Sequence, residues 1–145
     1  MGTRSRSTPR HVLVVDDDDM NRRLVGLCLR GIEDVEVHEA PNGLAALRSI
    51  GVYRPALIIL DVDMPGLDGY RLIQIIRRLS PWCGDVPLLV LSAAVEATTR
   101  SLAAGADECM MKPMRDPSVL RAKVSRWLDD ADASATAPSP AQAAR

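Results

Sequence analysis

Four places in the chain put side chains able to do chemistry directly after an apolar run. They are the aspartates at 16–19, Asp61 with Asp63, Ser92, and Lys112. Crowded carboxylates repel one another unless protons or a cation neutralise them, and oxygen ligands without His or Cys favour a hard ion such as Mg2+. The pattern therefore predicts a metal site with a hydroxyl and an amine at its edge.

None of these residues is specific by itself. An Asp after a strand is often a helix cap, and we interpret Asp18 and Asp19 as capping or solvated turn residues. A single Ser at a strand end is usually structural, and a single Lys is usually a solvated charge. The combination becomes informative only if the fold brings the four places together.

The apolar runs predict the elements that would do this. Residues 11–15, 56–60 and 88–91 form continuous apolar runs, which are typical of strands buried on both faces. We expect weaker strands at 35–39 and 108–111, and helices at about 20–30, 44–50, 72–79, 97–104 and 120–128. Alternating strands and helices predict a parallel sheet covered on both faces, and ligands of such sheets bind at the carboxyl ends of the strands.

Two of the helices carry specific expectations. In the helix at 97–104 the only large apolar anchor is Leu102, so this helix should be able to move. In the helix at 20–30 the stripe of Leu24, Val25, Cys28 and Leu29 should be buried, which leaves Leu27 on another face.

Length and composition bound the class of protein. The chain has 145 residues, enough for one domain, and its net charge of −1 argues against direct nucleic-acid binding. It contains neither a signal peptide pattern nor an apolar stretch of membrane-spanning length, so we expect a cytoplasmic location and no membrane insertion. Three widely spaced cysteines are expected to be free thiols.

Composition also predicts the domain boundaries. We expect the folded domain to cover 11–130, with disordered tails at 1–10 and 131–145. The second tail is rich in Ala, Ser and Pro, and it is equally compatible with a linker to a further domain.

Four sequence blocks resemble the conserved blocks of CheY-like response regulator receiver domains. They are Val-Val-Asp-Asp at 14–17, Asp-Val-Asp-Met-Pro-Gly-Leu-Asp-Gly at 61–69, Leu-Ser-Ala at 91–93, and Lys-Pro at 112–113. The resemblance covers about 11–128. It implies an α/β fold of the flavodoxin-like (βα)5 type, a doubly wound parallel five-stranded sheet with strand order 2-1-3-4-5.

The resemblance also implies roles for individual residues. Asp61 would accept a phosphoryl group from a sensor histidine kinase or phosphotransfer protein. Asp17, Asp16 through water, Asp61 and the backbone carbonyl of Asp63 would hold Mg2+, while Ser92 and Lys112 would bind phosphoryl oxygens. Such a domain phosphorylates and dephosphorylates itself and turns over no external substrate. Its downstream partner would be a protein target or an effector domain.

The output surface implied by the resemblance combines the helix at 97–104, the strand at 108–111 and the last helix. Family members often form homodimers through this face. Many carry Tyr or Phe where this chain has Cys109, so the way phosphorylation is reported outward stays open. Met110 and Met111 either fill the core or offer adaptable contacts. On the helix at 20–30, the resemblance makes Leu27 with Arg23 a candidate for kinase docking.

Other features of the resemblance concern shape and lifetime. Asp63 and Ala94 occupy positions that tune loss of the phosphoryl group in the family. The peptide bond between Lys112 and Pro113 resembles one that is cis in the family. Pro65, Gly66 and Gly69 are expected to shape the turn after Asp61.

Three alternatives remain. The chain could be the amino-terminal receiver of a longer regulator, or a scaffold of the same fold that is not phosphorylated. Asp61-Val-Asp63 also resembles the nucleophile box of haloacid-dehalogenase-like phosphohydrolases, but that box usually follows the first strand of the fold. No P-loop pattern follows the first strand.

Overall fold

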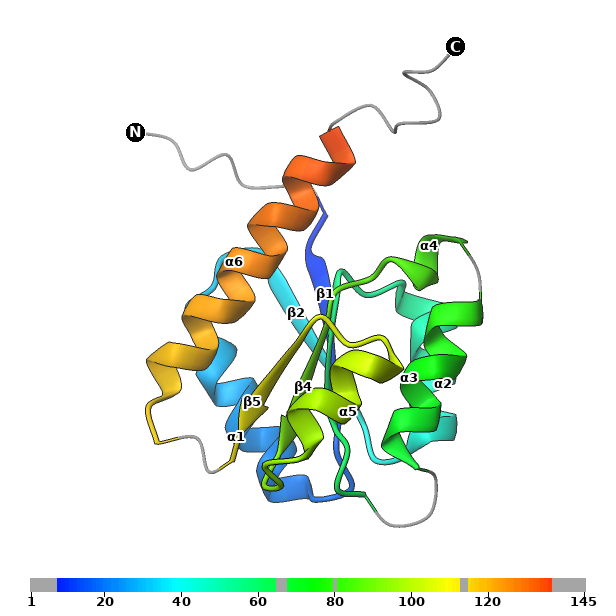
Figure 1. Ribbon diagram of the computed structural model, residues 1–145. Coiled ribbons are helices and arrows are strands. Elements are labelled where there is room, and N and C mark those ends of the chain that lie inside the picture. Colours follow the sequence, from blue (N-terminus) through cyan, green and yellow to red (C-terminus); the bar gives the residue numbers. More distant parts are fainter. Residues whose placement is uncertain (1–7, 65–67, 80, 113–114, 137–145) are drawn as a thin grey trace.

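The computed structural model describes residues 8–64, 68–79, 81–112 and 115–136. Within these residues, five parallel strands form one sheet in the order β2-β1-β3-β4-β5 (Figure 1). The strands are β1 (Arg10–Val15), β2 (Val35–Ala40), β3 (Leu57–Asp61), β4 (Leu88–Ser92) and β5 (Glu108–Met111). Parallel pairing and this strand order confirm the predicted flavodoxin-like fold.

Helices cover both faces of the sheet. They are α1 (Asp19–Leu29), α2 (Gly43–Tyr53), α3 (Gly69–Leu79), α4 (Pro81–Gly84), α5 (Ala97–Ala104) and α6 (Pro117–Thr136). Helices α1 and α6 pack together on one face, and α3 lies between α2 and α5 on the other (Figure 1). The single turn α4 was not predicted, because four residues are too few to show a helical period.

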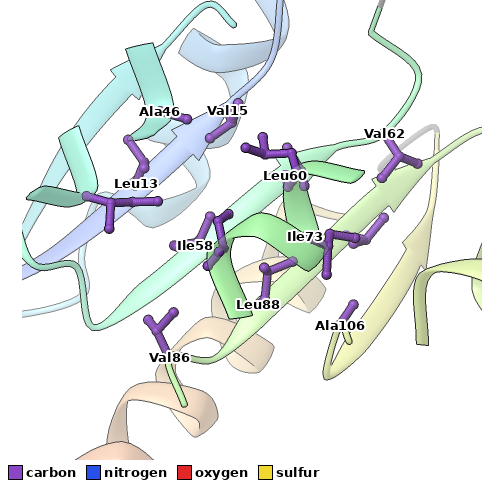
Figure 2. Close-up of a cluster of buried hydrophobic side chains, with 14 of the residues drawn as sticks. Leu13, Val15, Ala46, Ile58, Leu60, Val62, Ile73, Val86, Leu88 and Ala106 are labelled. Carbon is purple, nitrogen blue, oxygen red and sulfur yellow. The ribbon is translucent and has the colours of Figure 1, made fainter. Parts of the chain in front are cut away.

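The core consists of two layers separated by the sheet. The layer under α2 and α3 contains Leu13 of β1, Ile58 and Leu60 of β3, Leu88 of β4 and Ile73 of α3 (Figure 2). The opposite layer joins alternate residues of the same strands to α1 and α6. All five residues of β3 and of β4 are buried, which explains why both strands read as continuous apolar runs.

One expected burial in α1 is wrong. Leu24 is 50% exposed, whereas the guanidinium of Arg22 takes the place expected for an apolar side chain. Arg22 is buried because it donates to the carbonyl oxygen of Asp16 at 2.6 Å and to Glu39 at 3.2 Å. The predicted exposure of Leu27 is confirmed, at 51%.

The capping prediction is confirmed for Asp18, whose carboxylate accepts from the backbone amides of Met20 and Asn21. Asp19 is the first residue of α1 and forms an ion pair with Arg22. Both residues therefore shape the start of the helix.

Helix α5 is held more weakly than expected. Leu102, the predicted anchor, is 47% exposed, and the helix buries only Ala97 and Ser101. The hydroxyl of Ser101 is buried without a hydrogen-bond partner among the described residues. By contrast, α3 buries Leu72, Ile73 and Ile76 in the core.

Arg77 of α3 connects the segments at the amino ends of the strands. Its guanidinium donates to the carbonyl oxygens of Gly105, Gly84 and Val86 at 2.7, 3.1 and 2.5 Å. It also pairs with Asp107 at 2.8 Å. One side chain thus ties α3 to the ends of α4 and α5 and to the segments that enter β4 and β5.

The two ends of the described chain meet. The guanidinium of Arg10 lies 3.1 Å from the carboxylate of Asp132 and 3.7 Å from that of Asp129. Strand β1 begins at Arg10. Helix α6 continues to Thr136, beyond the expected domain boundary at 130. The alanines after 130 favour helix, and the ion pairs attach this extension to β1. None of the described helices has the length and apolar character needed to cross a bilayer.

Candidate functional site

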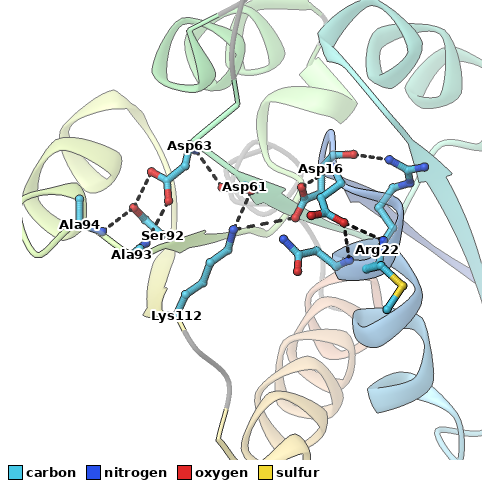
Figure 3. Close-up of polar contacts among 11 residues, drawn as sticks. Asp16, Arg22, Asp61, Asp63, Ser92, Ala93, Ala94 and Lys112 are labelled. Atoms are coloured by element: carbon cyan, nitrogen blue, oxygen red, sulfur yellow. Dashed lines mark hydrogen bonds and ion pairs between the residues drawn. The ribbon is translucent and has the colours of Figure 1, made fainter.

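The four places with reactive side chains converge at the carboxyl edge of the sheet (Figure 3). Asp16 follows β1, Asp61 ends β3, Ser92 ends β4, and Lys112 follows β5. The sheet order places β3 between β1 and β4, so Asp61 is the central member of the group.

Three carboxylates form an acidic group beside Asp61. Oxygens of Asp16, Asp17 and Asp61 all lie within 4.8 Å of one another. Asp16 and Asp61 are buried, whereas Asp17 is exposed to solvent. Burial raises the pKa of Asp16 to about 6, and the charge of Asp61 adds to this increase against the opposing effects of the Asp18 amide and Lys112. An oxygen-only donor set that carries unneutralised negative charge fits a hard divalent cation such as Mg2+.

Lys112 supplies positive charge to this group. Its ammonium donates to one carboxylate oxygen of Asp61 at 2.7 Å and lies 3.9 Å from Asp16. The other oxygen of Asp61 accepts from the backbone amide of Asp63 at 2.8 Å. Both oxygens of Asp61 are therefore positioned by donors, so its carboxylate is held in one orientation.

Ser92 and Asp63 form a second contact beside Asp61. The Ser92 hydroxyl donates to one carboxylate oxygen of Asp63 at 2.9 Å, and the Ala93 amide donates to the other at 3.0 Å. The Ala94 amide donates to the Ser92 hydroxyl at 3.1 Å. This role of the Asp63 side chain was not predicted. The available signal was a carboxylate two residues past β3 beside the Ser that ends the neighbouring strand.

The turn after Asp61 is fixed by close packing. A Cβ added at Gly69 would lie 2.7 Å from Cα of Val62, so this position requires glycine. The expectation that Gly69 is a shape residue is consistent with this contact. Pro65 and Gly66 lie outside the described residues, as do Pro113 and Met114, and with them the peptide bond after Lys112.

An aromatic side chain does occur near Cys109, but it comes from α3. Tyr70 and Cys109 are partly buried against the same core layer. The guanidinium of Arg100 on α5 lies 4.0 Å from the centre of the Tyr70 ring and 3.7 Å from the carboxylate of Asp68. Burial raises the pKa of Tyr70. This contact between α3 and α5 was not predicted, because nothing in the sequence around Tyr70 points to α5.

Of the two methionines beside Cys109, Met110 fits the interpretation as a core residue and Met111 fits the interpretation as a contact residue. Met110 is partly buried against the core layer of α1 and α6, whereas Met111 is 42% exposed. Leu27 and Arg23 line a shallow cavity between α1 and β2. Their role in kinase docking stays a prediction.

Comparison with known proteins agrees with this geometry. The family model for the response regulator receiver domain matches residues 12–125. The transcriptional regulatory protein CseB of Streptomyces coelicolor is 40% identical over 116 residues, which are 79% of this chain and 47% of that protein. The chain spans about half the length of the curated relatives it matches.

Solved structures show the same fold. A response regulator from Chloroflexus aurantiacus is 35% identical and superposes with a TM-score of 0.76, covering 84% of this chain and 99% of its own. The chemotaxis response regulator CheY4 of Vibrio cholerae is 30% identical, with a TM-score of 0.74 over 83% of this chain and 99% of its own. The chain belongs to the response regulator receiver domains of two-component signalling.

Proposed function

We propose that Asp61 accepts a phosphoryl group from a phosphohistidine of a sensor histidine kinase or phosphotransfer protein. The observation that carries this proposal is the meeting of Asp16, Asp17 and Asp61 within 4.8 Å, with the Lys112 ammonium 2.7 Å from Asp61. Mg2+ held by Asp17, Asp61, the Asp63 carbonyl and, through water, Asp16 would neutralise charge on the incoming phosphoryl oxygens.

The residues of the chain have separate tasks in this reaction. A carboxylate oxygen of Asp61 attacks phosphorus, the bond from phosphorus to the imidazole nitrogen breaks, and the imidazole leaves with the electron pair and takes up a proton. Lys112 moves its hydrogen bond from Asp61 to a phosphoryl oxygen. The fixed orientation of Asp61 favours attack in line with the leaving nitrogen.

Ser92 must change partner for the phosphoryl group to bind. In the described state its hydroxyl and the Ala93 amide are both bound to Asp63. We propose that these two donors turn from the Asp63 carboxylate to a phosphoryl oxygen. This exchange would move the chain at 92–94, which leads directly into α5.

The weak attachment of α5 favours it as the element that responds. Few buried side chains resist its displacement, and its contact with α3 through Arg100 and Tyr70 is exposed at one edge. We propose that phosphorylation shifts α5 and β5, and so changes the face formed with α6 for a protein target, an effector domain or a second copy of the chain. Cys109 would take part without an aromatic switch.

We propose that the site does not turn over an external phosphoester. In the nucleophile box Asp61-Val62-Asp63, the second carboxylate accepts hydrogen bonds from the Ser92 hydroxyl and the Ala93 amide. We therefore propose a signalling domain of the cytoplasm that modifies only itself and does not bind nucleic acid directly. The length of its relatives favours an effector domain as the partner.

Intact-mass measurement after incubation with Mg2+ and acetyl phosphate tests the acceptor. We expect a single phosphoryl adduct on the wild type and on Asp68→Asn, an exposed control in the same turn, and none on Asp61→Asn. An adduct that survives in Asp61→Asn would refute the assignment. Absence of both the adduct and Mg2+ binding in the wild type would instead identify a scaffold.

Amide spectra test the output. Beryllofluoride, which mimics the phosphoryl group, should shift resonances from Ala93 through Met111. Unchanged spectra over this range would exclude the proposed response of α5 and β5.

A further inference from the structure

Two histidines and a glutamate meet at the amino ends of β1 and β2, far from the phosphoacceptor. Nδ1 of His11 lies 2.9 Å from Nε2 of His38, and this nitrogen lies 3.8 Å from a carboxylate oxygen of Glu36. One ligand atom from each residue lies within 4.8 Å of the other two. The three groups therefore converge on one point.

Strand pairing determines this convergence. His11 is the register partner of Glu36, and His38 lies two residues farther along β2. Residues two apart in a strand point to the same face, so Glu36 and His38 project together beside His11. Because β2 is the last strand of the sheet, the group lies at its edge and remains open to solvent on one side.

Packing holds the two imidazoles in place. The ring of Tyr53, at the end of α2, stacks on His38 with 3.6 Å between ring centres and an angle of 15°. The side chain of His38 is only 12% exposed, whereas that of Glu36 is 55% exposed. Burial lowers the pKa of His38, which favours the neutral ring that metals bind.

We propose that His11, His38 and Glu36 bind a borderline transition-metal ion such as Zn2+. Imidazole nitrogens and a carboxylate are ordinary zinc ligands, and three protein ligands leave a fourth tetrahedral position for water or a partner's donor. With Zn–N bonds of about 2.05 Å, the two nitrogens would lie about 3.3 Å apart. They need to separate by only a few tenths of an ångström from their observed contact.

The bound form requires a defined proton arrangement. Nδ1 of His11 and Nε2 of His38 must both present lone pairs, so each neutral ring carries its proton on the other nitrogen. Without metal, one of the two facing nitrogens carries the proton of their hydrogen bond. Binding therefore exchanges one hydrogen bond for two metal bonds through a change of tautomer.

This site differs from the acidic group in both place and chemistry. His11 and Asp16 are five residues apart along β1, which corresponds to about 16 Å. The acidic group offers oxygen only and favours Mg2+, whereas two imidazoles favour Zn2+. Excess Mg2+ should therefore leave the histidine site available.

Imidazole NMR on the full chain without an affinity tag provides the test. His11 and His38 are the only histidines in the sequence, so their ring nitrogens give two separate sets of signals. With excess Mg2+ present, one equivalent of Zn2+ should shift Nδ1 of His11 and Nε2 of His38 to values typical of coordinated nitrogen. Unchanged ring signals at this ratio would overturn the proposal and leave a hydrogen-bonded histidine pair.

Variants give a second measurement by calorimetric titration with Zn2+ under the same conditions. His38→Gln should abolish this binding, and Glu36→Gln should weaken it by about tenfold. Glu33→Gln makes the same charge change at an exposed position and should leave affinity unchanged. Equal affinity in all three variants would place Zn2+ elsewhere, at thiols or the acidic group, and would also overturn the proposal.

Discussion

The two ends of the sheet treat charge in opposite ways. At the carboxyl end, three carboxylates lie together, and the two that are buried pair with Lys112. At the amino end, Arg77 makes four hydrogen bonds, and Glu108 is bound by both Lys123 and Trp127 of α6. The carboxyl end therefore keeps negative charge available for a ligand, whereas the amino ends of β4 and β5 neutralise charge internally and stabilise the fold.

The crowded carboxylates at the carboxyl end lower the stability of the fold. Natural proteins break local rules mainly at functional sites, and a buried carboxylate beside another carboxylate is such a break. Substitutions at the two ends should consequently have opposite effects on stability.

The largest effect is expected at the amino end, from Arg77→Met. The change removes the side-chain donor of three carbonyl oxygens and leaves the Asp107 carboxylate with the Leu88 amide, so the free energy of unfolding should fall by about 3 kcal/mol. Chemical denaturation measures this loss. The exposed neighbour Arg78→Met should stay within about 0.5 kcal/mol of the wild type. An equal loss in both variants would show that Arg77 has no special role.

At the carboxyl end, Asp16→Asn should stabilise the protein. In buffer without divalent cations it removes a buried charge that faces Asp61, which should raise the free energy of unfolding by about 2 kcal/mol at neutral pH. The exposed Asp17→Asn should give a smaller gain. Destabilisation by Asp16→Asn would contradict the description of this end as strained by like charges.

The same Asp16→Asn variant should accept phosphate more slowly. Loss of one carboxylate weakens the attraction for Mg2+, so we expect at least about a tenfold lower rate with acetyl phosphate. Stability and activity should thus change in opposite directions, measured by denaturation and by intact mass.

Acid should weaken the amino end. Burial raises the pKa of Glu108, but the hydrogen bonds from Lys123 and Trp127 outweigh it and hold the pKa below the ordinary 4.5. Its contribution is therefore complete above about pH 5 and is lost as the pH falls through the lowered value. Glu108→Gln should cost about 1 kcal/mol at neutral pH and little in acid. The exposed control Glu96→Gln should stay within about 0.5 kcal/mol of the wild type at neutral pH.

The smallest effect is expected at Ser101 of α5, whose buried hydroxyl has no hydrogen-bond partner among the described residues. Ser101→Ala removes a buried donor without a partner and should stabilise the protein by about 0.5 kcal/mol. Ser49→Ala, in the partly buried middle of α2, controls for the higher helix propensity of Ala. A gain no larger than the control's would mean that the Ser101 hydroxyl is satisfied in solution.

The sequence was sufficient to predict the sheet and the meeting of Asp16, Asp61, Ser92 and Lys112 at its carboxyl edge. Continuous apolar runs identify β3 and β4, and Asp61 and Ser92 follow from where those runs end. Strand ends are set locally, and parallel pairing then brings them together without further information.

Contacts that depend on where a side chain reaches in three dimensions were not predictable in this way. Arg22 is buried by partners on two different segments, so its charge concealed its place in the core. Arg77 binds carbonyl oxygens from segments far apart in sequence, and no local pattern encodes them. Leu24 and Leu102 were expected to be buried, but both are about half exposed. Periodicity shows which side chains share a helix face, but it does not show how far neighbouring elements cover that face.

The Asp63 contact gives the site an internal competitor. Its carboxylate already holds the Ser92 hydroxyl and the Ala93 amide, the donors that an incoming anion would need. Free inorganic phosphate must displace this resident carboxylate, which is tethered to the chain and so present at high effective concentration. A phosphoryl group bonded to Asp61 is also tethered to the chain, so its effective concentration is comparable with that of the Asp63 carboxylate. The domain should therefore ignore the phosphate ions of the cell and respond to covalent modification alone.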